Sequence, residues 1–359
     1  MDGLAVRPWH DHEKTSDYGI QEISSQGECP GDIRHRELGM RKKKMEKWAL
    51  VFPGQGSQYV GMGADLFREF DAFRGIFSRA QDITGMDIAG ICLEGPQDVL
   101  DQTVHTQLAV LTFELAAYEI FKGHISGAAP AVAAGHSLGE YSALYAAGSL
   151  GLEETITIVQ ARAKRHQEAL PPGIGAMAAI LGLDYEAVRR VCTTCSLPGE
   201  PLDLANLNAP NQIVISGNAR AVERVGEMAR EAGIKKFVPL PISVPCHSLL
   251  LTEAAELFSG DLAKIDFQPC LIPVIPNYDP SRFHSPDNSR ELLRRQMVSP
   301  VRWQETVERM TALGITTVVE IGPRKVLAGL IKNINRQMRL LYVGDGESLL
   351  KTVASLQYR

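Results

Sequence analysis

The stretch AAGHSLGEYSALYAAG, residues 133–148, places Ser137 between two glycines that lie two positions away on either side. Small apolar residues precede the serine and a helical pattern follows it. In the pattern Gly-x-Ser-x-Gly, the serine lies on a sharp, strained turn between a strand and a helix. A side chain at either glycine would crowd this turn. The stretch therefore predicts a strand–turn–helix unit of an α/β fold, with Ser137 as a candidate nucleophile.

The composition is that of a globular protein, with 45% hydrophobic and 22% charged residues. Its 359 residues allow two domains, or one large domain with an insertion. A net charge of −5 is not the positive charge expected of a protein that binds nucleic acid or anionic membranes. No apolar run approaches the roughly 18 residues that span a bilayer, and no apolar stretch of signal-peptide type opens the chain. We expect a cytoplasmic protein.

The six cysteines are scattered, which argues against a disulfide framework and favours a reducing compartment. Cys192 and Cys195 have the spacing of a redox or zinc motif, but no second pair accompanies them. Structural zinc needs four ligands. We therefore expect ordinary thiols and no metal site.

The chain divides into a tail and a patterned remainder. Residues 1–44 are polar, lack a helix or strand period and are predicted to be disordered. Strand and helix patterns then alternate. The segment 173–243 shows the order β-α-β-β-α-β of a ferredoxin-like unit, with Asp184 as an expected N-cap. We expect this small subdomain to be inserted in a large α/β subdomain made of residues 45–172 and 244–359.

A serine hydroxyl needs a base to take its proton, and the sequence alone leaves two candidates. His247 follows the proline-rich run 239–245, where the inserted unit returns to the large one. His284 lies in the polar loop SRFHSPDNS, a poor place to hold a base rigidly. His136 adjoins the serine, but on a sharp turn we expect its ring to point away and to be an orienting or packing residue.

Acyl transfer also needs hydrogen-bond donors for the oxyanion. The backbone N–H of Leu138, directly after the serine, can supply one donor, and the start of the following helix adds its positive end. A second can come from Gln55 in the loop PGQG, although without Ser137 a plain tight turn would be the better interpretation of that loop.

Five motifs in order resemble the malonyl-CoA:acyl-carrier-protein transacylase family over about residues 46–345. They are FPGQGSQ at 52–58, GHSLGE at 135–140, NLNAPNQIVISG at 206–217, VPCH at 244–247 and EIGP at 320–323. The resemblance implies an α/β-hydrolase-like large subdomain with an inserted ferredoxin-like one. This agrees with the pattern of strands and helices.

The resemblance also implies roles for individual residues. Ser137 matches the nucleophile and His247 the base, without a triad carboxylate. Gln55 and Leu138 match the oxyanion donors. Further matches are Arg162 for binding the malonyl carboxylate, Gln296 for hydrogen bonding the histidine, and Asn208 and Val244 for contacts in the pocket or with CoA. From spacing alone, Arg162 would be a helix-surface arginine.

The function so implied is transfer of malonyl from malonyl-CoA to the phosphopantetheine thiol of an acyl carrier protein, by a ping-pong mechanism through a malonyl-serine. No cofactor is implied, and we expect a monomer. The alternatives are a discrete trans-acting polyketide-synthase acyltransferase and an α/β-hydrolase thioesterase. Thioesterases, however, have the order Ser, Asp or Glu, His, with the histidine near the chain end. For an acidic carrier, a basic rim is expected at Lys235, Lys236, Arg294 and Arg295.

Overall fold

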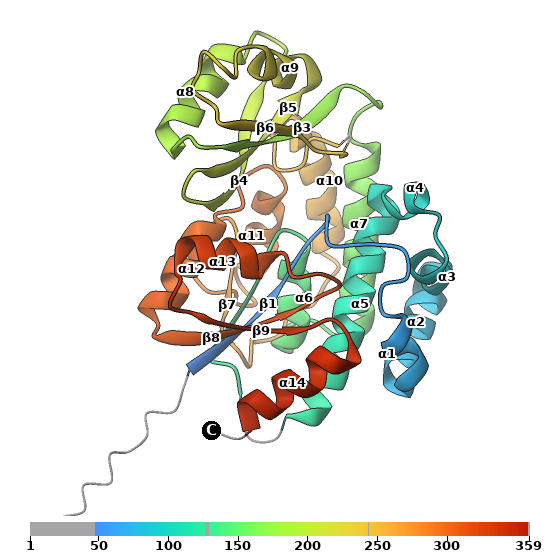
Figure 1. The fold of residues 1–359 in the computed structure, drawn as a ribbon. Coiled ribbons are helices and arrows are strands. Elements are labelled where there is room, and N and C mark those ends of the chain that lie inside the picture. Colours follow the sequence, from blue (N-terminus) through green and yellow to red (C-terminus); the bar gives the residue numbers. More distant parts are fainter. Residues whose placement is uncertain (1–46, 126–128, 243, 358–359) are drawn as a thin grey trace, which may run out of the picture. The chain divides into compact units, whose positions relative to one another are not determined.

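A five-stranded parallel sheet organises the larger part of the chain (Figure 1). The computed structural model describes residues 47–125, 129–242 and 244–357. The strand order is β7-β2-β1-β8-β9. The strands are β1 (Lys47–Phe52), β2 (Val132–Gly135), β7 (Val274–Ile275), β8 (Ile315–Ile321) and β9 (Arg339–Val343). Because all neighbouring pairs are parallel, the carboxyl ends of these strands meet at one edge of the sheet.

Helices cover both faces of this sheet. Successive side chains of β1 point to opposite faces and are apolar on both, so each face must be covered. Trp48, Leu50 and Phe52 pack in the larger core cluster with α5 (Thr103–His124), α6 (Gly139–Ala146) and α7 (Leu152–Glu168). Ala49 and Val51 face the other way, against α12 (Trp303–Ala312) and α13 (Leu327–Ile334). The central strand is thus buried on both faces, in agreement with the predicted α/β class.

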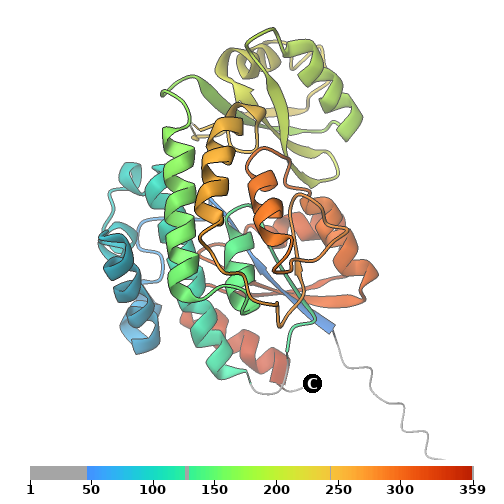
Figure 2. The same ribbon diagram turned by 180° about the vertical axis from the view of Figure 1, so that it is seen from behind.

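The remaining helices of the large part complete these layers. They are α1 (Ala64–Glu69), α2 (Asp71–Thr84), α3 (Ile88–Leu93), α4 (Gln97–Leu100), η1 (Leu249–Leu251), α10 (Thr252–Leu262), α11 (Ser289–Gln296) and α14 (Gly346–Gln357). Seen from behind, α7 and α10 run side by side (Figure 2). Among the described residues, no helix is both long and apolar enough to cross a bilayer.

The second sheet is antiparallel and has the order β4-β5-β3-β6. Its elements follow each other as β3 (Gly175–Leu181), α8 (Tyr185–Cys195), β4 (Leu202–Ala209), β5 (Gln212–Asn218), α9 (Ala219–Glu227) and β6 (Lys236–Pro239). This confirms the predicted ferredoxin-like order. The Asp184 carboxylate accepts from the Ala187 N–H, so the expected N-cap is present as well.

A β-bridge between Asn206 and Val301 connects the small sheet to the large part. The Leu207 N–H donates to the Val301 carbonyl at 2.8 Å, and the Val301 N–H donates to the Ala205 carbonyl at 2.9 Å. The outer edge of β4 is thereby held against the segment between α11 and α12. The limits 173–243 for the small subdomain stay a prediction, and the tail 1–44 lies outside the described residues.

Two helical predictions need correction. The pattern through Phe67, Phe70, Phe73 and Phe77 predicts one helix, but Phe70 has extended backbone angles and separates α1 from α2. The pattern ARAVERVGEMAREAG predicts a helix over residues 219–233, but α9 ends at Glu227. The last six residues of the pattern form turns that close at Gly233, whose φ is +74°. In both cases the apolar spacing continues across a break in the backbone, and spacing alone cannot detect that break.

Candidate active site

Ser137 lies on the predicted sharp turn between β2 and α6. Its φ of +53° is in the left-handed region, which a serine rarely adopts. A Cβ atom at Gly135 would overlap the backbone of Gly139, and a Cβ at Gly139 would overlap the carbonyl of Phe52. The two glycines therefore let the turn form against β1. They fix the serine at the carboxyl edge of the parallel sheet.

His247 contacts this serine, with its Nε2 atom 2.8 Å from Ser137 Oγ. The Nδ1 atom lies 2.7 Å from the backbone carbonyl of Gln296. Because a carbonyl only accepts, the ring hydrogen is on Nδ1, and Nε2 is free to accept from the serine hydroxyl. Burial and then the charge of Arg162 lower the pKa of His247 to about 3. The ring is thus neutral at physiological pH.

Arg162 reaches the same serine from α7. Its Nη2 donates to Ser137 Oγ at 3.0 Å and to Gln296 Oε1 at 3.1 Å, and its Nη1 donates to Gln107 Oε1 at 2.6 Å. The residue is 2% exposed, and its Nε atom has no hydrogen-bond partner among the residues that the structure describes. Within the described ranges no Asp or Glu forms an ion pair with it. The site therefore contains a buried positive charge whose partners are neutral.

The loop after β1 lies directly against the serine turn. A Cβ atom at Gly54 would be 2.5 Å from the His136 carbonyl and 3.7 Å from the Leu138 nitrogen. Gln55 is the next residue. The Gln55 and Leu138 N–H groups donate to no other group in the part of the chain that the structure describes. Their placement fits the predicted oxyanion donors, and that role stays a prediction.

Gln296, at the end of α11, joins the serine, the histidine and the arginine. Its carbonyl accepts from His247, its Oε1 accepts from Arg162, and its Nε2 donates to the Ser137 carbonyl at 2.9 Å. The contact to the histidine, which the resemblance implies, is therefore made by the backbone and not by the side-chain amide.

Two buried residues behind the turn have no predicted role. Asn277 accepts from the Ser137 N–H at 2.6 Å and donates to the Gly135 carbonyl at 2.6 Å. Glu140 accepts from the Asn277 N–H at 2.8 Å and from Gln296 Nε2 at 2.9 Å. Glu140 lies within a quoted motif, but its partners are more than 130 positions away in the chain. No spacing rule could have linked them.

His284 is not at the nucleophile, and the expectation of a loosely held loop residue is wrong. Its side chain is fully buried, with Nε2 2.8 Å from Glu140 Oε1 and Nδ1 3.0 Å from Ser289 Oγ. Because the Glu140 carboxylate accepts, Nε2 donates to it, and the buried ring is held between Glu140 and Ser289.

The other predicted residues lie around the site without contacting Ser137. Asn208 Oδ1 bonds the His136 ring at 2.8 Å, and that ring packs against Trp303, so His136 has the packing role expected for it. Val244 is buried beside His166 and Pro245. No contact shows either Asn208 or Val244 to be a ligand-binding residue, and that part of the prediction stays open.

The remaining buried histidine and the cysteines have pKa values shifted by burial. His166 lies on α7 and is fully buried, and burial lowers its pKa. Burial raises the pKa of Cys192 to about 12 and of Cys246 to about 11. The described cysteines are free, and Cys29 lies outside the described residues. Within the described ranges, no group of three or more His, Cys, Asp or Glu is placed to hold a metal ion.

Comparisons with known proteins agree on one family. The family model for the acyl transferase domain matches residues 49–348. A malonyl CoA-acyl carrier protein transacylase of Bacillus subtilis (strain 168) is 42% identical over 87% of this chain and 98% of its own length.

Two solved structures extend this likeness to the fold. An acyl carrier protein S-malonyltransferase of Vibrio cholerae has 42% identity and a TM-score of 0.81, covering 85% of this chain and 99% of its own. A malonyl-transacylase solved with a type II polyketide-synthase acyl carrier protein has 40% identity and a TM-score of 0.83. That match covers 86% of this chain and 99% of the solved one.

Proposed function

The chain belongs to the acyl transferase domain family, and on this basis we propose that it transfers the malonyl group of malonyl-CoA to an acyl carrier protein. The observation that carries the proposal is the contact of Ser137 Oγ with both a neutral histidine and a buried arginine. The first group can activate the serine, and the second can bind an acyl group that ends in a carboxylate.

The reaction begins with attack of Ser137 Oγ on the thioester carbonyl of malonyl-CoA. His247 Nε2 takes the hydroxyl proton as the new C–O bond forms. The Gln55 and Leu138 N–H groups hold the negative charge of the tetrahedral intermediate. The C–S bond then breaks, the CoA sulfur takes the proton back from His247, and the malonyl group stays on the serine.

The second half repeats these steps with a different thiol. The phosphopantetheine thiol of the carrier gives its proton to His247 and attacks the malonyl-serine carbonyl. When the C–O bond to Ser137 breaks, the serine oxygen recovers the proton. Asn277 and Gln296 orient the serine turn and the histidine through the hydrogen bonds described above. This reaction needs only the protein, malonyl-CoA and the carrier.

Arg162 supports malonyl as the acyl group. A carboxylate beside Ser137 would pair with a guanidinium that has only neutral partners in the described structure. The planar guanidinium can donate two parallel hydrogen bonds to a carboxylate. A neutral acyl group would leave that buried charge without a counterion, which is unfavourable. The arginine thus distinguishes malonyl from acetyl.

The family relatives favour this transferase over the thioesterase alternative. Whether the carrier takes part in fatty-acid or polyketide synthesis stays open, because the polyketide carrier named above belongs to another protein. A cytoplasmic location and a monomeric state remain part of the proposal. The free thiols of the described cysteines support a reducing compartment.

Intact mass after mixing with malonyl-CoA, without an acceptor, tests the proposal. The wild-type chain should gain the mass of one malonyl group and lose it when a carrier protein is added. Ser137→Ala should gain nothing, while Ser281→Ala, a serine in an exposed loop, should behave as the wild type does. An unmodified wild-type chain, or a gain that survives in Ser137→Ala, would exclude the malonyl-serine.

A further inference from the structure

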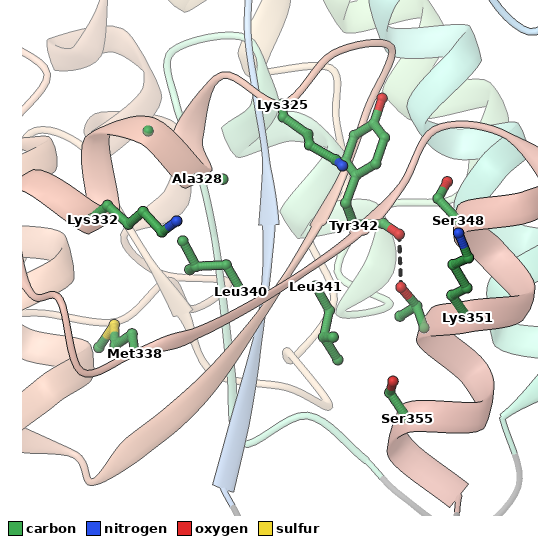
Figure 3. Close-up of a pocket in the computed structure, with 12 residues that line it drawn as sticks. Lys325, Ala328, Lys332, Met338, Leu340, Leu341, Tyr342, Ser348, Lys351 and Ser355 are labelled. Atoms are coloured by element: carbon green, nitrogen blue, oxygen red, sulfur yellow. Dashed lines mark hydrogen bonds between the residues drawn. The ribbon is translucent and has the colours of Figure 1, made fainter.

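The groove along the edge strand β9 is separate from the reacting groups. It has a volume of about 570 Å³ and is lined by residues of β9, α13 and α14 and of their adjoining loops (Figure 3). Within the described part of the chain, none of these lining residues hydrogen-bonds to Ser137 or His247. The groups that fix the base lie instead in residues 244–249, which we call the histidine loop.

His247 has a backbone conformation that needs support from its surroundings. Its φ of +64° is in the left-handed region, which is unfavourable for a residue other than glycine. The residue lies between β6 and η1, outside helices and strands. Its ring is nevertheless fixed at both nitrogen atoms, with Nε2 2.8 Å from Ser137 Oγ and Nδ1 2.7 Å from the Gln296 carbonyl. Contacts on each side of His247 must therefore hold the loop in place.

One such contact follows the histidine directly. The Asp203 carboxylate, on β4, accepts from the Ser248 hydroxyl at 2.6 Å and from the Leu249 N–H at 2.9 Å, and both donors reach the same oxygen, Oδ2. Ser248 is fully buried, and its Oγ accepts from the Leu250 N–H at 3.2 Å and so caps η1. Among the described residues, no Lys or Arg forms an ion pair with Asp203. The carboxylate thus holds the two residues that come after His247.

A second contact precedes the histidine. The Cys246 N–H donates to the Val244 carbonyl at 2.8 Å, which closes a tight turn around Pro245. Pro245 is buried and packs against Gly175, the first residue of β3, where a Cβ atom would lie 2.3 Å from the proline Cδ. Glycine at this position lets the proline ring lie against the strand. Both ends of the histidine loop are therefore held by the small antiparallel sheet.

We propose that Asp203 is a positioning residue for His247, so that the small sheet holds the base that acts on Ser137. The inference rests on the proposed function, in which His247 takes the proton of the serine. A base must lie within hydrogen-bond reach of the proton that it removes, and a displacement of about 1 Å can lower a rate about a hundredfold. In the described structure Asp203 has no hydrogen bond to Ser137, so its effect on the reaction passes through the histidine.

The test is a double-mutant cycle on acylation of the serine by malonyl-CoA, measured by rapid quench and intact mass. The variants are Asp203→Ala, His247→Ala and the two combined, with Asp203→Asn as the conservative replacement. Because both donors of the histidine loop reach one oxygen, the amide oxygen of asparagine can accept from both. The matched control is Asp184→Ala, which removes the carboxylate cap of α8 beside the same sheet.

Asp203→Ala should lower the maximal acylation rate by about ten- to a hundredfold per folded molecule. The half-saturating concentration of malonyl-CoA should stay within about twofold, because the contacts of Arg162 are unchanged. Asp203→Asn should recover most of the lost rate, and Asp184→Ala should match the wild type. In the His247→Ala background, adding Asp203→Ala should change the residual rate by less than about twofold, since the group that it positions is absent.

An equal loss on adding Asp203→Ala in the wild-type and His247→Ala backgrounds would overturn the proposal, because the carboxylate would then support the fold and not the base. So would Asp203→Asn acylating as slowly as Asp203→Ala, or a change confined to the half-saturating concentration.

A second variant covers the case in which Asp203→Ala does not fold. Ser248→Ala removes the hydroxyl bond to Asp203 and leaves the bond from Leu249. It should slow acylation less than Asp203→Ala does, and this loss should also vanish in the His247→Ala background; acylation at the wild-type rate would overturn the proposal. A wild-type chain that is not acylated would refute the proposed function, whereas an acylated wild type with additive losses would refute the role of Asp203 alone.

Discussion

Replacing Arg162 by alanine should reduce malonyl transfer far more than acetyl transfer. The guanidinium is 2% exposed and 3.0 Å from Ser137 Oγ, and its hydrogen-bond partners are neutral. A charge-assisted hydrogen bond contributes about 1.5–3 kcal/mol, so two parallel bonds to a carboxylate contribute about 3–6 kcal/mol. At about 1.4 kcal/mol for each factor of ten, kcat/KM for malonyl-CoA should fall by about 10²- to 10⁴-fold.

Acetyl transfer should stay level or rise in the same variant. An acetyl group offers no counterion, so in the wild type it leaves the buried guanidinium unpaired. Arg162 also donates to Ser137 and Gln296, and losing those bonds affects both acyl groups equally. The ratio of malonyl to acetyl kcat/KM therefore isolates the effect of the carboxylate.

The assay is rapid-quench acylation of the serine by malonyl-CoA and by acetyl-CoA, followed by intact mass. Arg165→Ala is the matched control, because Arg165 lies on the same helix but pairs with Asp261. Arg162→Lys keeps the charge and loses the planar fork, so its ratio should be intermediate. If the ratio in Arg162→Ala equals that of the wild type, the arginine does not recognise the carboxylate.

Four further outcomes are expected. His247→Ala should slow acylation by about 10²- to 10⁴-fold per folded molecule, and a larger loss in His284→Ala would show that the base is misassigned. Because the pKa of His247 is about 3, acylation kcat/KM should stay level from pH 8 to 5; a fall centred near pH 6.5 would contradict this. Burial lowers the pKa of His136, His166 and His247. The unfolded chain therefore takes up protons below about pH 6.5 that the folded chain does not, and stability present above that pH is lost as the pH falls. His247, whose pKa is about 3, should alone remove up to about 1.4 kcal/mol of the free energy of unfolding per pH unit. A free energy of unfolding in urea that is the same at pH 5.5 and pH 7.5 would refute this. Gly135→Ala should abolish acylation or folding because its Cβ would overlap Gly139, whereas Gly75→Ala, at an open helix position, should be neutral or stabilising in thermal unfolding.

Local patterns in the sequence were sufficient for much of the fold. The β-α-β-β-α-β order of the small sheet follows from alternating apolar residues and a capped helix, both of which are local signals. The serine turn was predictable because steric crowding at Gly135 and Gly139 requires glycine there. The break at Phe70 was not predictable, since apolar spacing continues through it.

Only some of the site residues could be predicted from the sequence. Ser137 could be found from its motif, but spacing alone could not choose between His247 and His284. The structure separates them, because one ring lies at the serine and the other pairs with Glu140. Glu140 and Asn277 were missed because a buried hydrogen bond between distant parts of the chain produces no repeating pattern in the sequence. Arg162 likewise resembles an ordinary helix arginine until its burial is known.

The carbonyl partner of His247 has a consequence for the lifetime of the acyl-enzyme. A peptide carbonyl carries no net charge, so it stabilises an imidazolium less than the carboxylate of a hydrolase triad would. With a pKa of about 3, the ring is a weak base. A thiol with a pKa of about 8.5 yields its proton to such a base far more readily than water, whose pKa is about 15.7. The ester on Ser137 should therefore pass to a thiol faster than to water, because a thiol needs less help from the base, whereas the Ser137 hydroxyl is activated by being held 2.8 Å from it.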